Sequence, residues 1–162
     1  MNISEAMTPD PACCTRGDSV QAAAIIMREL SVGVVPVIDS DDSQKLVGVV
    51  TDRDLCMDVV AEGKNPADTK VGDCMTTELI TCHPNDDIEQ VAHMMQQNQI
   101  RRVPVVDDDF HLKGIVSMAD IVLCGDLPSE EIDETMRDIS EPTFEEFQHL
   151  CALDAISIEE QK

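Results

Sequence analysis

The stretch GVVTDRDL at residues 48–55 returns as GIVSMADI at residues 114–121. Each copy gives a glycine, two β-branched residues, a hydroxyl residue, two variable positions, an aspartate and an aliphatic residue. An apolar run that ends in a hydroxyl residue, with an acid three positions later, predicts a strand followed by the start of a helix. A chain of 162 residues that carries this arrangement twice is predicted to contain two copies of one structural unit.

The repetition extends beyond this motif. The pair MT at 7–8 recurs at 75–76, DSVQAAAIIM at 18–27 aligns with DDIEQVAHMM at 86–95, and SVGVVPVID at 31–39 aligns with QIRRVPVVD at 99–107. These segments are shifted by 68 residues, and the shift falls to 66 at the opening motif because a polar loop is two residues longer in the first copy. We predict repeat 1 at residues 1–63, a linker at 64–72 and repeat 2 at residues 73–125.

Each repeat is predicted to fold as strand, helix, strand, strand, helix. The expected strands are 12–14, 34–38 and 46–50 in repeat 1, and 80–82, 103–106 and 112–116 in repeat 2. The first helices are expected to begin at Asp18 and Asp86, where acids and amides have the spacing of a capping box. Pro36 and Pro104 lack a backbone donor, which predicts an edge strand or a strand start. One unit alone buries too little apolar surface, so two copies are expected to close one core.

The hydroxyl residues and acids of the motif, Thr51 with Asp54 and Ser117 with Asp120, have two interpretations. They fit simple caps, in which the hydroxyl accepts from a backbone N–H and the acid lies at the positive end of the helix. They also fit a nucleotide site, with phosphate at the N–H groups of the helix start and a ribose diol on the carboxylate. The spacing alone does not separate the two.

The tandem order of MT, capped helix, VPVVD-type strand and glycine–hydroxyl–aspartate motif resembles the cystathionine-β-synthase (CBS) domain pair, or Bateman module, from Met7 to Gly125. This resemblance implies an α/β fold of two β-α-β-β-α repeats, packed through their sheets about a pseudo-two-fold axis that leaves two clefts. It also implies adenosine-containing ligands, such as AMP, ADP, ATP or S-adenosylmethionine. The ribose would bind the motif aspartate, and phosphate would often bind the motif hydroxyl.

The resemblance further implies which residues line each cleft. Cleft one is expected to combine Thr51 and Asp54 with Ile80, Thr81, Arg101 and Arg102. Cleft two is expected to combine Ser117 and Asp120 with Ala12, Cys13, Gly33 and Val34. Because guanidinium groups grip phosphate oxygens in pairs, cleft one is expected to take a phosphorylated ligand, and cleft two to be empty or hold a less charged one. The alternative for the arginines is a surface pair that is salt-bridged to acids of the chain.

Charge excludes several classes of partner. The chain has 33 acids and 11 bases, a net charge of −22, so it should repel nucleic-acid polymers and anionic membrane but can still hold a small anion in one cleft. No apolar run spans a bilayer and the N-terminus lacks the pattern of a signal peptide, which predicts a cytoplasmic protein. Seven cysteines without a CxxC pair predict reduced thiols that pack as small hydrophobes, and no metal site.

No P-loop, GxSxG or HExxH motif is present, and His93 is expected to be a partly buried helix residue, so the chain is not predicted to be an enzyme. Two functions remain open. One is a regulatory sensor of adenosine-containing ligands, with output through a separate protein partner or through self-association. The other is a ligand-free module for dimerisation or protein interaction. The resemblance implies a homodimer, for which the helix faces at 22–27 and 94–95 are candidates; the alternative is that they face the core.

Residues 126–162 form an acidic extension, with twelve acids and two bases. A helix is expected to start at the sequence PSEE, residues 128–131, with acids in its first turn. A further helix is predicted after residues 142–143, with an apolar stripe. Its members are Phe144, Phe147, Leu150 and Cys151. The extension is predicted to pack on its own domain or a dimer mate, to dock a partner, or to be disordered.

Overall fold

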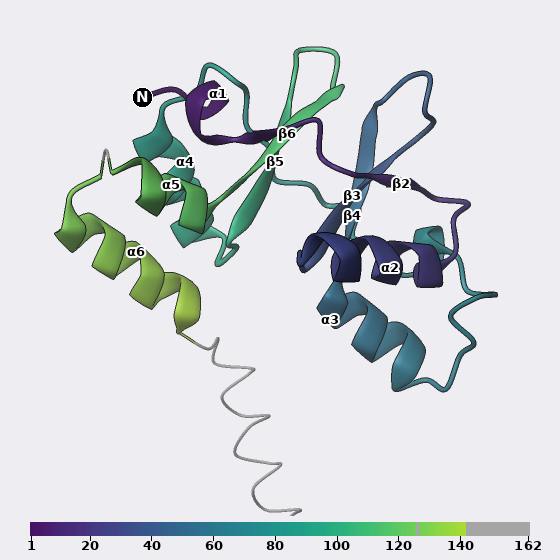
Figure 1. Ribbon diagram of the computed structural model, residues 1–162. Coiled ribbons are helices and arrows are strands. Elements are labelled where there is room, and N and C mark those ends of the chain that lie inside the picture. Colours follow the sequence, from purple (N-terminus) through teal and green to yellow (C-terminus); the bar gives the residue numbers. More distant parts are fainter. Residues whose placement is uncertain (126, 142–162) are drawn as a thin grey trace, which may run out of the picture.

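The structure is a computed structural model that describes residues 1–125 and 127–141, so the second predicted tail helix lies outside it. Two three-stranded sheets and their helices form a mixed α/β fold, which confirms the predicted class (Figure 1). The helices are α1 Ile3–Ala6, α2 Val20–Leu30, α3 Asp52–Leu55, α4 Ile88–Gln97, α5 Met118–Cys124 and α6 Ser129–Ser140, with a π-helical turn η1 Cys56–Val60 and a 3-10 turn η2 Val71–Asp73. The strands are β1 Thr8–Pro9, β2 Cys14–Thr15, β3 Val34–Ile38, β4 Leu46–Thr51, β5 Arg102–Val106 and β6 Leu112–Ser117.

Each repeat contributes one antiparallel hairpin, β3–β4 or β5–β6, in matching register. Val34 lies opposite Thr51 in the first hairpin, and Arg102 lies opposite Ser117 in the second. The parallel strand β2 extends the first sheet through Cys14 and Val37, and an isolated bridge from Cys82 to Val105 does the same in repeat 2. The four hairpin strands match their predicted bounds to within one residue.

The segments that carry the MT pair are exchanged between the repeats. Thr8 in β1 pairs with Ile115 of β6, and Thr76 pairs with Val49 of β4. The turn that precedes each segment also lies in the opposite repeat: Ile3 packs in the core of repeat 2, and Val71 packs in the core of repeat 1. Each sheet is therefore completed by chain from the other half of the molecule.

The motif glycines make room for these exchanged segments. A Cβ at Gly114 would lie 2.6 Å from the sulfur of Met7 and 2.9 Å from the carbonyl oxygen of Thr8. At Gly48 it would lie 2.8 Å from the sulfur of Met75 and 3.0 Å from the carbonyl oxygen of Thr76. Glycine at the head of the opening motif and the MT pair are thus two parts of one contact.

The first helix of each repeat begins later than predicted, and the predicted capping boxes there are wrong. The N-caps are Ser19, which accepts from the N–H of Ala22, and Asp87, which accepts from that of Glu89. Asp18 instead accepts hydrogen bonds from the N–H and hydroxyl of Thr15. Asp86 accepts from the N–H of His83 in the same way. Both acids close the turn that precedes the helix.

The predicted edge position is wrong for Pro36, because β3 has strands on both sides, but it holds for Pro104, because β5 is the outer strand of its three-stranded sheet. In repeat 2, Cys82 donates its N–H to the carbonyl of Pro104 at 3.1 Å and accepts from the N–H of Val106 at 2.9 Å. These groups point to one edge of β5, so the missing N–H of Pro104 points there too, just beyond the last bridge. Apart from the isolated bridge at Cys82, β5 is the outer strand of its sheet, so the proline removes no hydrogen bond from a strand ladder on this side.

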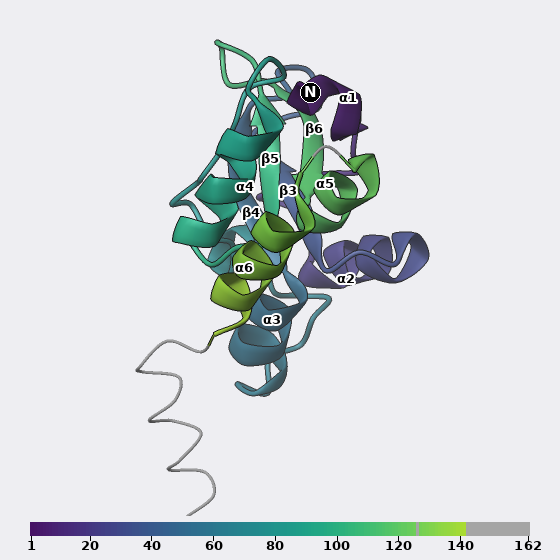
Figure 2. The ribbon, with the colours of Figure 1, turned by 90° about the vertical axis from the view of Figure 1, so that its left-hand side faces the viewer.

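The repeats meet at the hairpin ends about a pseudo-two-fold axis. The N–H of Leu46 donates to Phe110 at 3.0 Å, and that of Leu112 donates to Gln44 at 2.9 Å. Leu46 and Leu112 pack with Ile38 and Val106 in a small shared cluster. Figure 1 shows the helices α4, α5 and α6 beside the β5–β6 hairpin, and α2 and α3 beside the β3–β4 hairpin. In the side view of Figure 2, the first group lies in front of the second.

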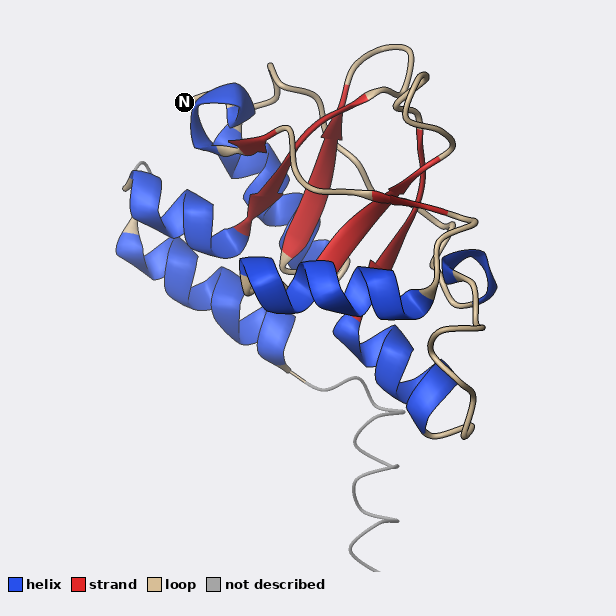
Figure 3. Ribbon diagram, turned by 45° about the vertical axis from the view of Figure 1, so that its right-hand side comes forward, coloured by secondary structure: helices blue, strands red, loops and turns tan. Residues whose placement is uncertain are grey.

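The acidic extension begins with the predicted helix, α6, which starts at Ser129 and packs along α4. In Figure 3, α6 is the blue helix that leads into the long grey trace. Ile139 of α6 and Leu127 just before it belong to the core of repeat 2. Within residues 1–125 and 127–141, α2 of repeat 1 has no such covering helix, and the two halves of the fold are therefore unequal on their outer faces.

Candidate functional site

The two hydroxyl–aspartate pairs have the same geometry at the ends of β4 and β6. Thr51 donates its N–H and its hydroxyl to Asp54 Oδ2, both at 2.8 Å, and accepts from the N–H of Asp54 at 3.2 Å. Ser117 and Asp120 repeat this pattern at 2.8, 2.6 and 3.2 Å. Both are complete capping boxes, so the structural interpretation of the motif is confirmed.

The caps leave one oxygen of each acid available. Oδ2 of Asp54 and of Asp120 takes the capping bonds, while no hydrogen bond to either Oδ1 is found in the described part of the chain. A half-buried carboxylate with a free oxygen can accept from the hydroxyls of a ribose. The motif hydroxyls already donate to the acids, so a phosphate would have to displace that bond.

The helix starts themselves are poor phosphate sites. In α3 the first three N–H groups are occupied, by the carbonyl of Gly33, by the Asp52 carboxylate and by the Thr51 hydroxyl. In α5 the N–H of Met118 donates to the carbonyl of Arg101 at 2.9 Å, and that of Asp120 to Ser117. The expected row of exposed N–H groups is therefore largely absent, and any phosphate would depend on side-chain cations.

The sheet register gathers the predicted cationic residues in repeat 2. Arg102 lies opposite Ser117, and Arg101 is bonded through its carbonyl to the first residue of α5. Ile80 and Thr81 directly precede Cys82, which pairs with β5, and both are half-buried. The grouping of the arginines with Thr51 and Asp54 stays a prediction, since no hydrogen bond or ion pair joins them among the described residues.

The corresponding end of repeat 1 carries different charges. Val34 lies opposite Thr51, where repeat 2 has Arg102 opposite Ser117. A Cβ at Gly33 would lie 2.9 Å from an oxygen of Asp52, so a carboxylate occupies the space that a side chain would need. Repeat 2 has Arg101 and the buried Met118 at these two positions. The start of α5 therefore has two arginines nearby, whereas the start of α3 carries Asp52 beside a single arginine, Arg53.

The arginines are not consumed by ion pairs. Neither Arg101 nor Arg102 forms a salt bridge to any acid in residues 1–125 or 127–141, and both are exposed. Arg101 makes one side-chain hydrogen bond, from Nη2 to the hydroxyl of Ser140 at 3.3 Å. The alternative of a salt-bridged surface pair is therefore not seen in the described part of the chain.

Cys13, the predicted cysteine of the second cleft, is half-buried against the shared cluster of the two hairpins. Burial raises the pKa of its thiol, and the nearby Asp41 and Asp18 raise it further. Burial likewise raises the pKa of Cys14 and of Cys82 to about 12. All six cysteines in the described residues are free thiols, and burial raises the pKa of the three that lie in the cores, Cys14, Cys74 and Cys82.

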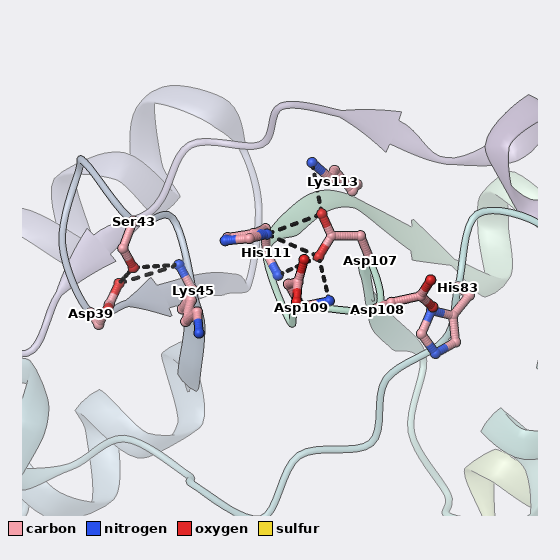
Figure 4. Close-up of polar contacts among 9 residues, drawn as sticks. All are labelled: Asp39, Ser43, Lys45, His83, Asp107, Asp108, Asp109, His111 and Lys113. Atoms are coloured by element: carbon pink, nitrogen blue, oxygen red, sulfur yellow. Dashed lines mark hydrogen bonds and ion pairs between the residues drawn. The ribbon is translucent and has the colours of Figure 1, made fainter.

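The hairpin end of the molecule carries a second group of polar residues (Figure 4). Asp107 accepts from the N–H and the ring of His111 and from Lys113 Nζ, at 2.8, 3.1 and 3.0 Å. Burial alone would raise the pKa of Asp107, but these hydrogen bonds hold it well below its usual range. In the first hairpin, Asp39 accepts from Ser43 and from the N–H of Lys45. These groups satisfy one another and fix the loops, so this end is not the candidate site.

The groove beside α4 is a poor candidate for a nucleotide site. A groove of about 560 Å³ between α4 and the start of α6 is lined by three glutamates, which disfavours an anionic nucleotide; its lining is His93, Gln96, Pro128, Glu130, Glu131 and Glu134. His93 is exposed and contacts Gln96 and Gln97, so its predicted burial is wrong. Within residues 1–125 and 127–141 we find no cluster of three metal-binding side chains, and no helix with the length and apolarity to cross a membrane.

Two repeats that exchange their MT segments, each with a hydroxyl–aspartate capping box at the end of a sheet, define a tandem-repeat module. The family model for the CBS domain matches residues 3–60 and 71–124, and the chain belongs to this family as a CBS domain pair. It is similar to the uncharacterized protein YlbB of Bacillus subtilis, with 37% identity over 86% of this chain and 91% of the relative. That coverage leaves little of YlbB for a further domain.

Solved CBS structures support the same fold. The CBS pair of MJ0100, in complex with 5-methylthioadenosine and S-adenosylmethionine, has a TM-score of 0.68 and 28% identity over 77% of this chain and 95% of that one. CBSX2 in complex with AMP has a TM-score of 0.65 and 29% identity over 76% and 95%. Hypoxic response protein I, with two coordinated zinc ions, has a TM-score of 0.68 and 30% identity over 79% and 100%.

Proposed function

We propose that this chain is a non-catalytic sensor that binds an adenosine phosphate beside α5. The ribose would be held by Asp120 Oδ1, and the phosphate by Arg101 and Arg102. The observation that carries the proposal is the register of the second hairpin, which puts Arg102 directly opposite Ser117 while Asp120 keeps one oxygen free. Two solved relatives hold adenosine-containing ligands, which supports the ligand class.

The site beside α3 is proposed to be weaker or to take a less charged ligand, such as S-adenosylmethionine. Thr51 and Asp54 offer the same hydroxyl and free carboxylate oxygen there, with Val34 opposite and Cys13 in the preceding strand segment. Asp52 adds a negative charge where repeat 2 has Met118. A ligand without phosphate avoids that repulsion.

Calorimetry with AMP, ADP, ATP and S-adenosylmethionine tests the proposal. Replacing both arginines, Arg101→Ala with Arg102→Ala, should abolish binding of the phosphorylated ligands, because hydrogen bonds to charged groups contribute about 1.5–3 kcal/mol each. Arg53→Ala is the matched control, since Arg53 is an exposed arginine at the start of α3. Unchanged AMP affinity in the double variant would refute the assignment.

The two capped acids offer a matched pair that identifies the site. Asp54→Asn and Asp120→Asn disturb identical caps and should cost similar stability. If the arginines act with α5, only Asp120→Asn weakens AMP binding. If instead only Asp54→Asn does so, the arginines act with the start of α3, as the resemblance alone implied.

A second candidate function, a dimerisation module, is favoured by exposed apolar side chains on the helices. Leu123 of α5 is 84% exposed and Val60 of η1 is 69% exposed. Met27 and Met95, within the helix faces expected to dimerise, are instead buried in the cores. We propose that the molecule forms a homodimer through these exposed side chains, Leu123 and Val60. The signal of ligand binding would pass through this contact or through a protein partner. Free thiols are consistent with a cytoplasmic location.

A further inference from the structure

The last turn of α6 is held by the loop that leads into the proposed phosphate site. The side-chain amide of Gln99 donates to the carbonyl oxygens of Asp138 at 3.2 Å and Glu141 at 3.1 Å. Two residues later, Arg101 Nη2 donates to the hydroxyl of Ser140 at 3.3 Å. The final carbonyls of a helix have no partner within the helix, so these donors cap its C-terminal end.

Among residues 1–125 and 127–141, this contact is found in repeat 2 and has no counterpart in repeat 1. Ser31 occupies the position of Gln99 in repeat 1, and both residues have a left-handed backbone, with φ of 54° and 51°. The loop conformation is therefore common to the two repeats, while its attachment to a C-terminal helix belongs to repeat 2. The attachment lies beside Arg101 and Arg102, the pair proposed to bind phosphate.

A phosphate and α6 would both contact the guanidinium of Arg101, and both are negatively charged. Residues 129–141 carry six acids and one base, and the C-terminal end of a helix is its negative pole. A nucleotide phosphate adds roughly two negative charges. If it takes Arg101, the Ser140 hydroxyl loses its donor, and the phosphate lies close to the end that bears Asp138 and Glu141.

We infer that α6 is the element that responds to the arginine site: binding of an adenosine phosphate releases the last turn of α6. This inference rests on the proposed function of the same site. Because coupling is reciprocal, weakening the hydrogen bonds from Gln99 and Arg101 to α6 must raise the affinity for the nucleotide by the same factor. These contacts are ordinary hydrogen bonds, so the expected change in nucleotide affinity is about two- to tenfold.

Two variants and AMP as the probe test the inference. Ser140→Ala removes the partner of Arg101, and Gln99→Asn shortens the capping amide while keeping a residue that tolerates the left-handed backbone. Each should bind AMP about two- to tenfold more tightly by calorimetry. The controls are Ser129→Ala, at the far end of α6, and Gln97→Asn, whose amide contacts His93; neither should change the affinity.

Amide hydrogen exchange reports on α6 directly. At saturating AMP, exchange of residues 138–141 should become faster in the full-length chain, while exchange in the core strand β5 should not. Tighter binding in neither variant, or unchanged or slower exchange of residues 138–141 with AMP bound, would overturn the inference and leave the nucleotide site intact. A chain that binds no AMP at all would overturn the proposed function, and the inference with it.

Discussion

Alanine at Gly114 should destabilise the fold at the point where the two halves exchange chain. The new Cβ would lie 2.6 Å from Met7 Sδ and 2.9 Å from the carbonyl oxygen of Thr8, against an ordinary contact of 3.4 Å or more. The methionine side chain can move away, but the carbonyl belongs to β1, which pairs with β6 at this residue. The strand itself must therefore shift by about half an ångström.

Overpacking of this kind costs roughly 1–3 kcal/mol. For a chain of this size, each kcal/mol corresponds to about 2–4 °C in the midpoint of thermal unfolding. Urea unfolding of wild type and Gly114→Ala should show this loss of free energy, and proteolysis should cut the variant faster within its first ten residues. Gly48→Ala should behave similarly, since its Cβ meets the carbonyl of Thr76 at 3.0 Å.

Gly17→Ala is the matched control, because the nearest atom to its Cβ is 3.9 Å away and its backbone is not left-handed. It should change the free energy of unfolding by no more than about 0.5 kcal/mol. Combining Met7→Ala with Gly114→Ala should recover only part of the loss, since the contact with Thr8 remains. If Gly114→Ala is as stable as the control, the exchanged segment does not pack against the glycine.

Three further outcomes are expected. Hydrogen bonds hold the folded pKa of Asp107 below its unfolded value of about 3.9. Asp107→Asn should therefore lower the free energy of unfolding at neutral pH, and the difference from wild type should shrink as the pH falls below about 4. An equal difference at both pH values, or an equal loss in the exposed Asp108→Asn, would contradict this. Near pH 8, a thiol reagent should label the exposed Cys56 quickly and the buried Cys14 and Cys82 slowly, and equal rates would mean that the cores open readily. Light scattering should give a dimer mass for wild type and a monomer mass for Leu123→Glu, and a monomeric wild type would remove the dimer proposal.

The repeat and its strands were predictable because both depend on local pattern. β-branched runs at a fixed offset give β3–β4 and β5–β6 to within a residue, and the motif hydroxyls cap α3 and α5 as expected. Helix starts were less predictable, since Ser19 follows Asp18 and Asp87 follows Asp86, and either residue of each pair can cap. Only the tertiary structure shows that Asp18 and Asp86 close the preceding turns.

The exchange of segments was not predictable from the recurrence of MT alone. A two-residue strand carries no pattern that names its partner, and sequence order favours pairing within the nearer repeat. The signal was the glycine that opens the motif, because glycine within a strand often marks close approach of another backbone. The candidate site residues stay predictions, and the grouping proposed for them depends on the register of Arg102 with Ser117, which only the hairpin shows.

The exchanged segments also have a consequence for the evolution of this molecule and for cutting it into fragments. Cutting the chain in the loop before Lys70 would leave two pieces that each hold a strand built for the other, so neither should be complete until they are mixed. A single-copy ancestor would have completed its sheet by exchanging this segment with a second, identical chain. Gene duplication would then have turned that contact between molecules into a contact within one chain.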